Sequence, residues 1–169
     1  MKGLIRLAVV VAVMVAGISS VSAQQAKIGY IRFDELVTSM PEYKTAGEEF
    51  EKKVQEIETQ RTKMQEEWSA AVKEYEEKAG TFTQIVRQAK EQEIMQMQQR
   101  IQNFVELAQQ ELKSVNEQLM APIYEKAKTT VDEVAKANGY TYVFDASALI
   151  YMAPDASDLM PLVKSKLGI

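Results

Sequence analysis

Two long stretches of the sequence carry apolar residues at steps of three and four, separated by a break at Ala79-Gly80-Thr81. This spacing predicts helices that bury one apolar stripe against a partner, as in a coiled coil. Because a helix rises about 1.5 Å per residue, the first stretch, starting at Glu42, is on the order of 57 Å long. That length exceeds an ordinary domain helix. The sequence therefore predicts one long antiparallel hairpin over residues 42–137.

The apolar stripes of the two arms predict the seam of this hairpin. The stripe of the first arm consists of Tyr43, Ala46, Phe50, Val54, Ile57, Met64, Trp68, Ala71, Tyr75 and Ala79, and that of the returning arm of Ile94, Met97, Ile101, Phe104, Ala108, Leu112, Val115, Leu119 and Ile123. Since each stripe can bury itself on the other, we interpret Trp68 and Phe104 as seam residues rather than ligand contacts. Arg61 interrupts the first stripe, so we expect an irregular supercoil there.

The turn between the arms is predicted to be short. Gly80 ends the first arm, and Thr81 with Gln84 three residues later resembles a capping box for the returning arm. The tip of the hairpin is therefore expected near residues 80–83.

The returning arm contains a second helix-breaking residue. Pro122 lies inside an otherwise continuous helical pattern, which predicts a kink about one turn before it. The pattern stops at Asn138-Gly139, a pair typical of a helix C-terminus, so the arm is expected to end at Ala137.

The segment before the hairpin, residues 24–41, predicts a strand and a short helix. Residues 27–33 are largely β-branched and aromatic, and Asp34 is suited to cap a helix over residues 35–39. Pro41 lacks an amide donor and suits the first turn of a helix, so the long arm should either begin or kink there.

The segment after the hairpin, residues 138–169, predicts two strands and a last helix. Residues 140–145 and 149–152 have the composition of strands and are expected to form a β-hairpin. Ser157 or Asp158 then caps a short helix that ends near Leu167. Three strands and two short helices make a small body that is marginal alone. We therefore expect self-association, which the free edge of the first strand makes geometrically easy.

The first 23 residues have the pattern of a cleavable export signal. Lys2 and Arg6 precede an apolar run from Leu7 to Ile18, and a small-residue site ends at Ala23. No later segment has the roughly 20 apolar residues that a membrane span needs. The mature chain is thus expected to be exported, without an integral membrane span.

The charge of the chain narrows the classes of partner. The formal charge of −4 becomes −6 once Lys2 and Arg6 leave with the signal. Nucleic acids and anionic lipids favour a basic face, so we expect neither as a partner. The sequence contains no His and no Cys, and no Gly-rich phosphate loop. An enzyme, a cofactor and a metal site are therefore not expected, because the commonest general base, nucleophile and zinc ligands are missing.

One line of the returning arm, on the side away from the seam, contains no charged residue. It comprises Ile85, Ala89, Gln92, Gln96, Gln99, Asn103, Leu107 and Gln110, and continues to Ser114. A solvated coiled-coil face normally carries Glu and Lys. The line is either a chance feature of a Gln-rich helix or a wall that contacts unfolded chains without sequence selectivity.

The order of these segments resembles the Skp family, also called OmpH, of periplasmic chaperones for unfolded outer-membrane proteins. The most specific matches are KIGYIRFDEL, from Lys27 to Leu36, and PIYEKAKTTVDEVAKANGYTYVFDAS, from Pro122 to Ser147. The resemblance implies a mainly α fold, in which a coiled-coil tentacle is anchored on a small β-sheet or barrel that trimerisation completes. It also implies an ATP-independent holdase that binds unfolded outer-membrane proteins in a cavity between the arms.

Trimerisation in that family implies a set of body residues here. The set consists of Ile28, Tyr30, Ile31, Tyr142, Val143 and Phe144. The charge departs from the family pattern, because familiar Skp chaperones are strongly basic whereas the mature chain is acidic. The sequence has no basic cluster that could correspond to a lipopolysaccharide site.

A structural protein of the cell envelope is the alternative. A coiled-coil spacer or adaptor would be a rigid, charge-decorated rod with a sticky tip, for which Phe82 is the candidate. A holdase would instead have a mobile hairpin with broad, weak contacts, and Gly47, Gly80 and Pro122 together with the uncharged line favour it.

Overall fold

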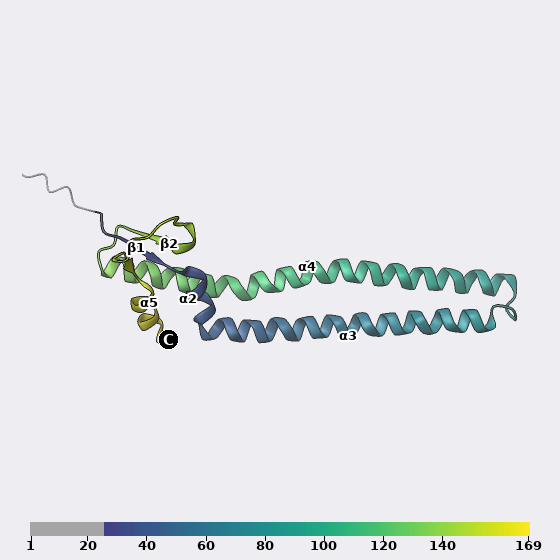
Figure 1. Cartoon of the computed structure of the whole chain (residues 1–169). Helices are drawn as coiled ribbons and strands as arrows, with labels where there is room; N and C mark the ends of the chain where they lie inside the picture. The colour runs from purple at the N-terminus through teal and green to yellow at the C-terminus, as the bar shows by residue number, and fades with distance from the viewer. Residues whose placement is uncertain (1–25) are drawn as a thin grey trace, which may run out of the picture.

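The computed structural model describes residues 26–169, so the predicted export signal lies outside the described residues. The elements, in chain order, are β1 (Ile28–Ile31), α2 (Phe33–Ser39), α3 (Pro41–Lys78), α4 (Gln84–Ala137), β2 (Tyr142–Asp145), the 3₁₀ turn η1 (Ala146–Ala148), β3 (Ser157–Asp158) and α5 (Met160–Leu167). Figure 1 shows α3 and α4 lying side by side as one long arm, with the remaining elements gathered at its base. The predicted mainly helical fold with a small sheet is confirmed.

The two arm helices differ in length. Helix α3 has 38 residues and begins at Pro41, as predicted, whereas α4 has 54 residues and continues past the start of α3 into the body. It is uninterrupted at Pro122, where a kink was predicted. It ends at Ala137, as predicted, and Gly139 follows with a φ of 71°, which favours glycine.

The cap at the tip differs from the predicted one. Thr83, not Thr81, precedes α4, and its hydroxyl accepts a hydrogen bond from the Val86 amide at 3.4 Å. The Thr81 hydroxyl instead donates to the Lys78 carbonyl at 2.7 Å, which satisfies an acceptor at the end of α3. The prediction of a capping box at Thr81 was wrong because that residue still belongs to the closing turn of α3.

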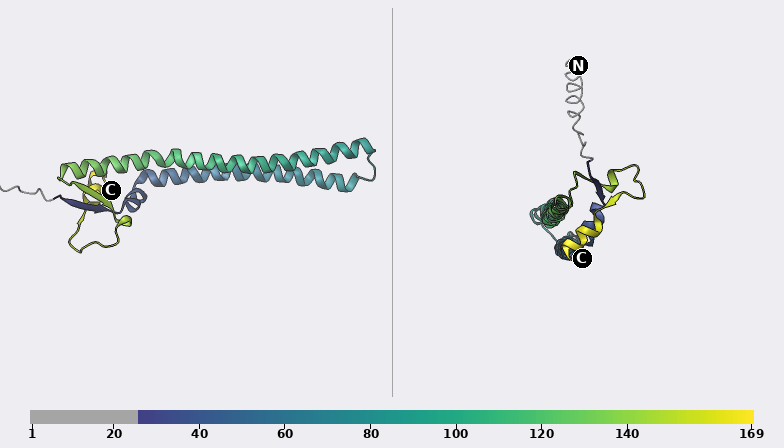
Figure 2. Two further views of the ribbon diagram at one scale, coloured as in Figure 1. Left: turned by 90° about the horizontal axis from the view of Figure 1, so that it is seen from above. Right: turned by 90° about the vertical axis from the view of Figure 1, so that its left-hand side faces the viewer.

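The sheet is parallel, with the order β2-β1-β3. Residues 149–152 are not a strand, so the predicted β-hairpin after α4 was wrong. The Asp145 carboxylate accepts from the Ser147 amide at 2.8 Å and helps turn the chain into η1. The chain then crosses to the far side of β1, where β3 begins only at Ser157 (Figure 2). The central strand is therefore β1, and the free edges belong to β2 and β3 rather than to the first strand.

The short helices are capped differently from each other. Asp34 was predicted to cap α2, but the helix begins at Phe33 and Asp34 lies in its first turn. The Asp158 carboxylate accepts from the Met160 amide at 2.8 Å, which supports the start of α5. Both predicted caps of this last helix lie in β3, and the N-cap position itself is Leu159, but of the two only Asp158 bonds to the start of α5.

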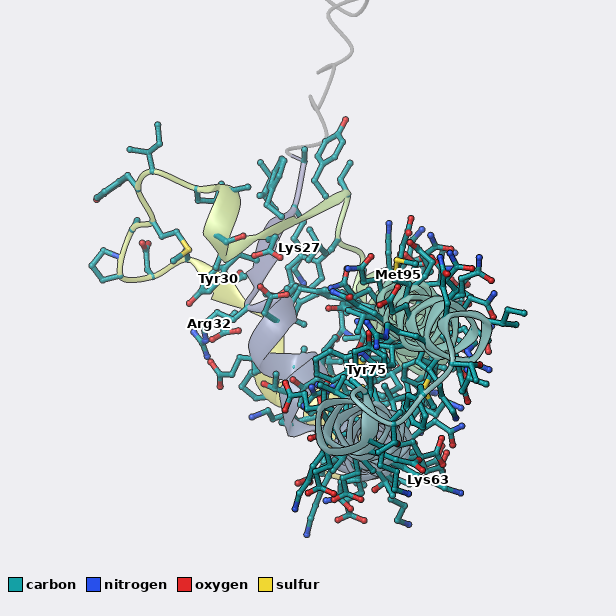
Figure 3. The ribbon with its side chains drawn as sticks, turned by 90° about the vertical axis from the view of Figure 1, so that its right-hand side faces the viewer. Lys27, Tyr30, Arg32, Lys63, Tyr75 and Met95 are labelled. Atoms are coloured by element: carbon teal, nitrogen blue, oxygen red, sulfur yellow. The ribbon has the colours of Figure 1, made fainter. Side chains whose placement is uncertain are left out.

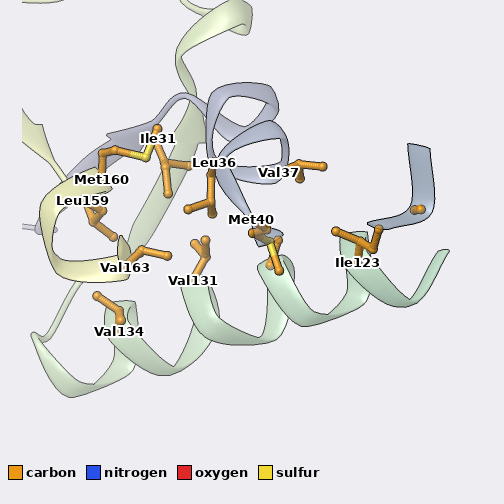
Figure 4. Packing of buried hydrophobic residues seen from close by; sticks show 12 residues of the cluster. Ile31, Leu36, Val37, Met40, Ile123, Val131, Val134, Leu159, Met160 and Val163 are labelled. Atoms are coloured by element: carbon orange, nitrogen blue, oxygen red, sulfur yellow. The ribbon is translucent and has the colours of Figure 1, made fainter. Parts of the chain in front are cut away.

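The core lies between the sheet, α2, α5 and the last part of α4 (Figure 4). Its largest fully buried side chains are Leu36, Met40, Leu159, Val37 and Val163. Helix α4 contributes Ile123, Ala127, Val131 and Val134. Gly29 of β1 faces this core so closely that a Cβ atom there would lie 2.3 Å from Leu159 Cδ1. The long returning helix is thus a component of the body as well as of the arm.

The predicted seam holds the arm together. Its residues are buried or half-buried in both helices, except Tyr43, which is 38% exposed near the base. In Figure 3, seen along the arm from the tip, Tyr75 lies between the two helices, whereas Lys63 and Met95 project from the outer sides of α3 and α4. Arg61 is half-buried in the seam, and its guanidinium pairs with Glu58 of its own helix at 2.8 Å. Within residues 26–169, no helix has the length and apolar character needed to cross a membrane.

Candidate functional site

The tip of the arm is closed by its own side chains. The ring of Phe82 packs against that of Tyr75 with their centroids 6.4 Å apart. The Tyr75 hydroxyl donates to the Glu91 carboxylate, which raises the pKa of Tyr75 because the bond favours the protonated phenol. The Arg87 guanidinium donates to the Ala79 carbonyl at 3.0 Å. Phe82 is therefore half-buried between the ends of α3 and α4 and does not project freely from the tip of the arm.

The uncharged line of the returning arm lies on the outer surface of α4. We call it the uncharged α4 face, and it consists of Ile85, Ala89, Gln92, Gln96, Gln99, Asn103, Leu107 and Gln110. All eight residues are exposed, including Ile85 at 80% and Leu107 at 64%. Gln99 Nε2 donates to Asn103 Oδ1 at 2.9 Å, which aligns two amides along the helix. The face thus combines accessible apolar side chains with accessible amide donors and acceptors.

Four exposed apolar or aromatic residues of the same helix belong neither to the predicted seam nor to the uncharged α4 face. They are Met95, Tyr124, Val86 and Val105, exposed by 60%, 43%, 41% and 37%. A scan for any apolar residue off the seam of α4 would find all four.

Charged side chains lie elsewhere on the arm. Lys53 of α3 pairs with Glu111 of α4 at 2.6 Å, and Lys90 pairs with Glu93 at 2.9 Å. At the base, Lys126 of α4 pairs with Glu42 of α3, which lowers the pKa of Glu42. These exposed pairs connect or decorate the helices and leave the uncharged α4 face free of charge.

The residues expected in the trimer body separate into two groups. Ile28, Tyr142 and Phe144 are exposed by 53%, 56% and 44%, and Tyr30 is half-buried. The rings of Tyr142 and Phe144 stack with their centroids 6.3 Å apart. In contrast, Ile31 is 3% exposed and Val143 packs against the core. The first group forms an accessible apolar sheet surface, whereas the second stabilises a single chain.

The loop from Leu149 to Ala156 adds to the exposed apolar surface of the body. Ile150 is fully exposed and Tyr151 is 78% exposed. Figure 2 shows this loop extending away from the helices. The sequence analysis had assigned part of it to a strand because its apolar residues have high β-propensity.

Within residues 26–169, no group of three or more acidic, His or Cys side chains is arranged to hold a metal ion. The described residues form a two-helix arm on a small parallel-sheet body, with an uncharged outer face on α4 and an exposed apolar sheet surface. This chain belongs to the OmpH-like outer membrane protein family, which it matches over residues 27–167.

The chain also shares its fold with a solved structure. The chain is 16% identical, with a TM-score of 0.75, to a candidate outer membrane chaperone (OmpH-like) from Caulobacter crescentus CB15. The match covers 84% of this chain and 83% of the other one. No curated protein matches the chain significantly.

Proposed function

We propose that this protein is a non-enzymatic, ATP-independent holdase of the periplasm that keeps unfolded outer-membrane proteins from aggregating. The uncharged α4 face is the observation that carries the proposal, because it exposes apolar and amide side chains along a single helix. Membership of the OmpH-like family and the outer membrane chaperone of the same fold support it.

The chemistry of the face suits an unfolded membrane protein. Segments of such a client are apolar, and a charged wall would have to lose its water when they docked, which is costly. Amide side chains such as Gln96 and Gln99 can donate to and accept from the unpaired backbone of the client, whatever its sequence. Ile85 and Leu107 add apolar contact area. We therefore expect many contacts spread along the face, each of them weak.

We further propose that the working form is a homotrimer assembled through the body. Ile28, Tyr142 and Phe144 expose apolar side chains on the sheet, and Ile150 and Tyr151 expose two more on the adjoining loop. Together with the free edges of β2 and β3, this surface suits association with further copies of the chain. Three arms on one body would enclose a cavity for the client.

Dilution of a denatured β-barrel membrane protein into buffer with and without the purified chain tests the holdase. Light scattering should stay low when the chain is present in molar excess. The effect should persist from low to physiological salt, since the acidic chain offers few cationic contacts to screen. Aggregation at the same rate with and without the chain would contradict the proposal.

Mass measurement by light scattering at micromolar concentration tests the assembly. A trimer is expected, and its unfolding midpoint should rise with protein concentration because folding and association are coupled. A folded monomer that persists on dilution would refute the trimer. The envelope spacer is less well supported, because Phe82 packs on Tyr75 instead of presenting a sticky tip.

A further inference from the structure

A groove opens at the base of the arm, where α2 meets α3 and α4. It has a volume of about 670 Å³, and the side chains that give it its character are Val37, Tyr43, Met120 and Tyr124 together with two carboxylates, Asp34 and Glu117. The ring of Tyr124 stacks on Phe33, with their centroids 6.1 Å apart, and Tyr124 remains 43% exposed. The Tyr124 ring in the wall of the groove is therefore held in place by Phe33, which packs against it.

The charge of this groove is negative. No cationic side chain lines it, although Asp34 and Glu117 do. Among residues 26–169, Asp34 makes no salt bridge, and Glu117 makes one, with the highly exposed Lys113 at 4.0 Å. Two tyrosine rings beside two carboxylates favour a cation, because a carboxylate is negative and a ring attracts a cation placed over its face.

The groove continues the uncharged α4 face. From Gln110, steps of three and four residues lead through Ser114 to Glu117, Ala121 and Tyr124, so all lie on one stripe of the helix. Ile85, at the other end of the stripe, lies on the order of 58 Å away at 1.5 Å per residue. An extended chain on the neutral face would thus meet the acidic groove at the base of the arm.

We propose that this groove binds a Lys or Arg side chain of an unfolded polypeptide that lies along the uncharged α4 face. The cation contacts Tyr43 and Tyr124 and pairs with Asp34 and Glu117, while its apolar neighbours contact Met120 and Ala121. The identity of the partner as an unfolded chain rests on the proposed holdase function. The groove thus gives the uncharged α4 face, which is otherwise unselective, a preference for clients that carry a Lys or Arg side chain.

Binding of short capped peptides to the full mature chain tests the proposal without an aggregation assay. One peptide carries a single Arg between two Leu residues, a second carries citrulline, the neutral isostere, in its place, and a third carries Glu. Titrations are followed by calorimetry and by the ring resonances of Tyr43 and Tyr124. The Arg peptide should bind about tenfold more tightly than the citrulline peptide, the sum expected for a cation–π contact and exposed ion pairs.

Two matched variants assign the effect to the groove. Asp34→Asn with Glu117→Gln should abolish the preference for Arg over citrulline, and helicity should be unchanged because both residues are exposed. Glu76→Gln with Glu77→Gln removes the same charge near the tip, at the far end of the arm, and should keep the preference within about twofold.

The outcomes separate this inference from the holdase proposal. Equal binding of the Arg and citrulline peptides, or no binding of either, would overturn the inference, and so would a preference that survives Asp34→Asn with Glu117→Gln. A concentration-dependent shift of the Tyr43 and Tyr124 resonances without peptide would assign the groove to a second copy of the chain, which also overturns it. If client holding persists in any of these cases, only the cation site fails.

Discussion

Placing three negative charges on the uncharged α4 face should weaken client holding and leave the fold intact. The changes are Gln96→Glu, Gln99→Glu and Asn103→Glu, and all three positions are exposed. The only hydrogen bond lost among them is the 2.9 Å bond from Gln99 to Asn103. The new carboxylates stand three or four residues from one another and from Glu93 and Glu106, which makes four like-charged pairs, while Arg100 has the same spacing to two of them and makes two attractive pairs. The net cost is therefore that of two like-charged pairs, about 0.2–0.5 kcal/mol each. The total stability cost is therefore no more than about 1 kcal/mol.

The cost to binding should be larger, because each carboxylate must lose water when an apolar segment docks. A buried polar group without a partner costs about 1–3 kcal/mol, and a charged one more. Since about 1.4 kcal/mol corresponds to a factor of ten, retention of the client should fall by at least about tenfold. Ile85→Ser with Leu107→Ser should act in the same direction by removing exposed apolar area.

A matched variant on α3 provides the control. Gln55→Glu, Thr59→Glu and Thr62→Glu add the same charge with the same steps of three and four, at exposed positions beside Glu58 and Lys63. Circular dichroism should show native helicity, and light scattering native mass, for both variants. A client titration monitored by aggregation should then separate them. If both variants hold the client as well as the parent chain does, the uncharged α4 face is not the contact surface.

Three further changes probe the arm and the body. Trp68→Ala should lower the melting temperature of the arm. The loss of unfolding free energy should be less than the about 3–5 kcal/mol of a fully buried aromatic, because Trp68 is half-buried. Unchanged melting with lost client binding would make Trp68 a client contact instead. Gly29→Ala should destabilise the body by about 1–3 kcal/mol in a denaturant titration, because its Cβ would lie 2.3 Å from Leu159 Cδ1; a variant of parental stability would contradict that packing. The Glu42–Lys126 pair lowers the pKa of Glu42 below its ordinary value of 4.5, so its stabilisation is full at neutral pH and is lost as the pH falls through the lowered pKa. Amide protection factors at the start of α3, which correct for the intrinsic pH dependence of exchange, should therefore fall in that acidic range in the parent but not in Glu42→Gln.

The arm could be predicted from the sequence because its signal is local. Each seam residue, such as Phe50 or Phe104, repeats at helical spacing, and the partner stripe is in the same chain. The sheet could not be predicted in the same way, because strand pairing joins residues far apart in sequence, such as Ile28 and Tyr142. The residues at 149–152 have a strand-like composition but pair with no strand among residues 26–169.

The candidate site was predictable only in part. Plotting the helix at 100° per residue located the uncharged α4 face, because exposure follows from the position of the seam. The groove at the base combines Asp34 from α2, Tyr43 from α3 and Tyr124 from α4. No periodicity in the sequence brings three separate helices together, so this feature required the tertiary structure.

The continuity of α4 makes the arm a lever. About 38 residues of the helix project beyond the body and about 16 lie within it, so the projecting length is roughly 57 Å against an embedded length of roughly 24 Å. A tilt of the embedded end by about 5° would move the tip by about 5 Å. That end carries Ile123, Ala127 and Val131 in a close-packed core, which resists such a tilt. A load on the tip is therefore transmitted to the core, and the stiffness of the body sets how far the tip can move.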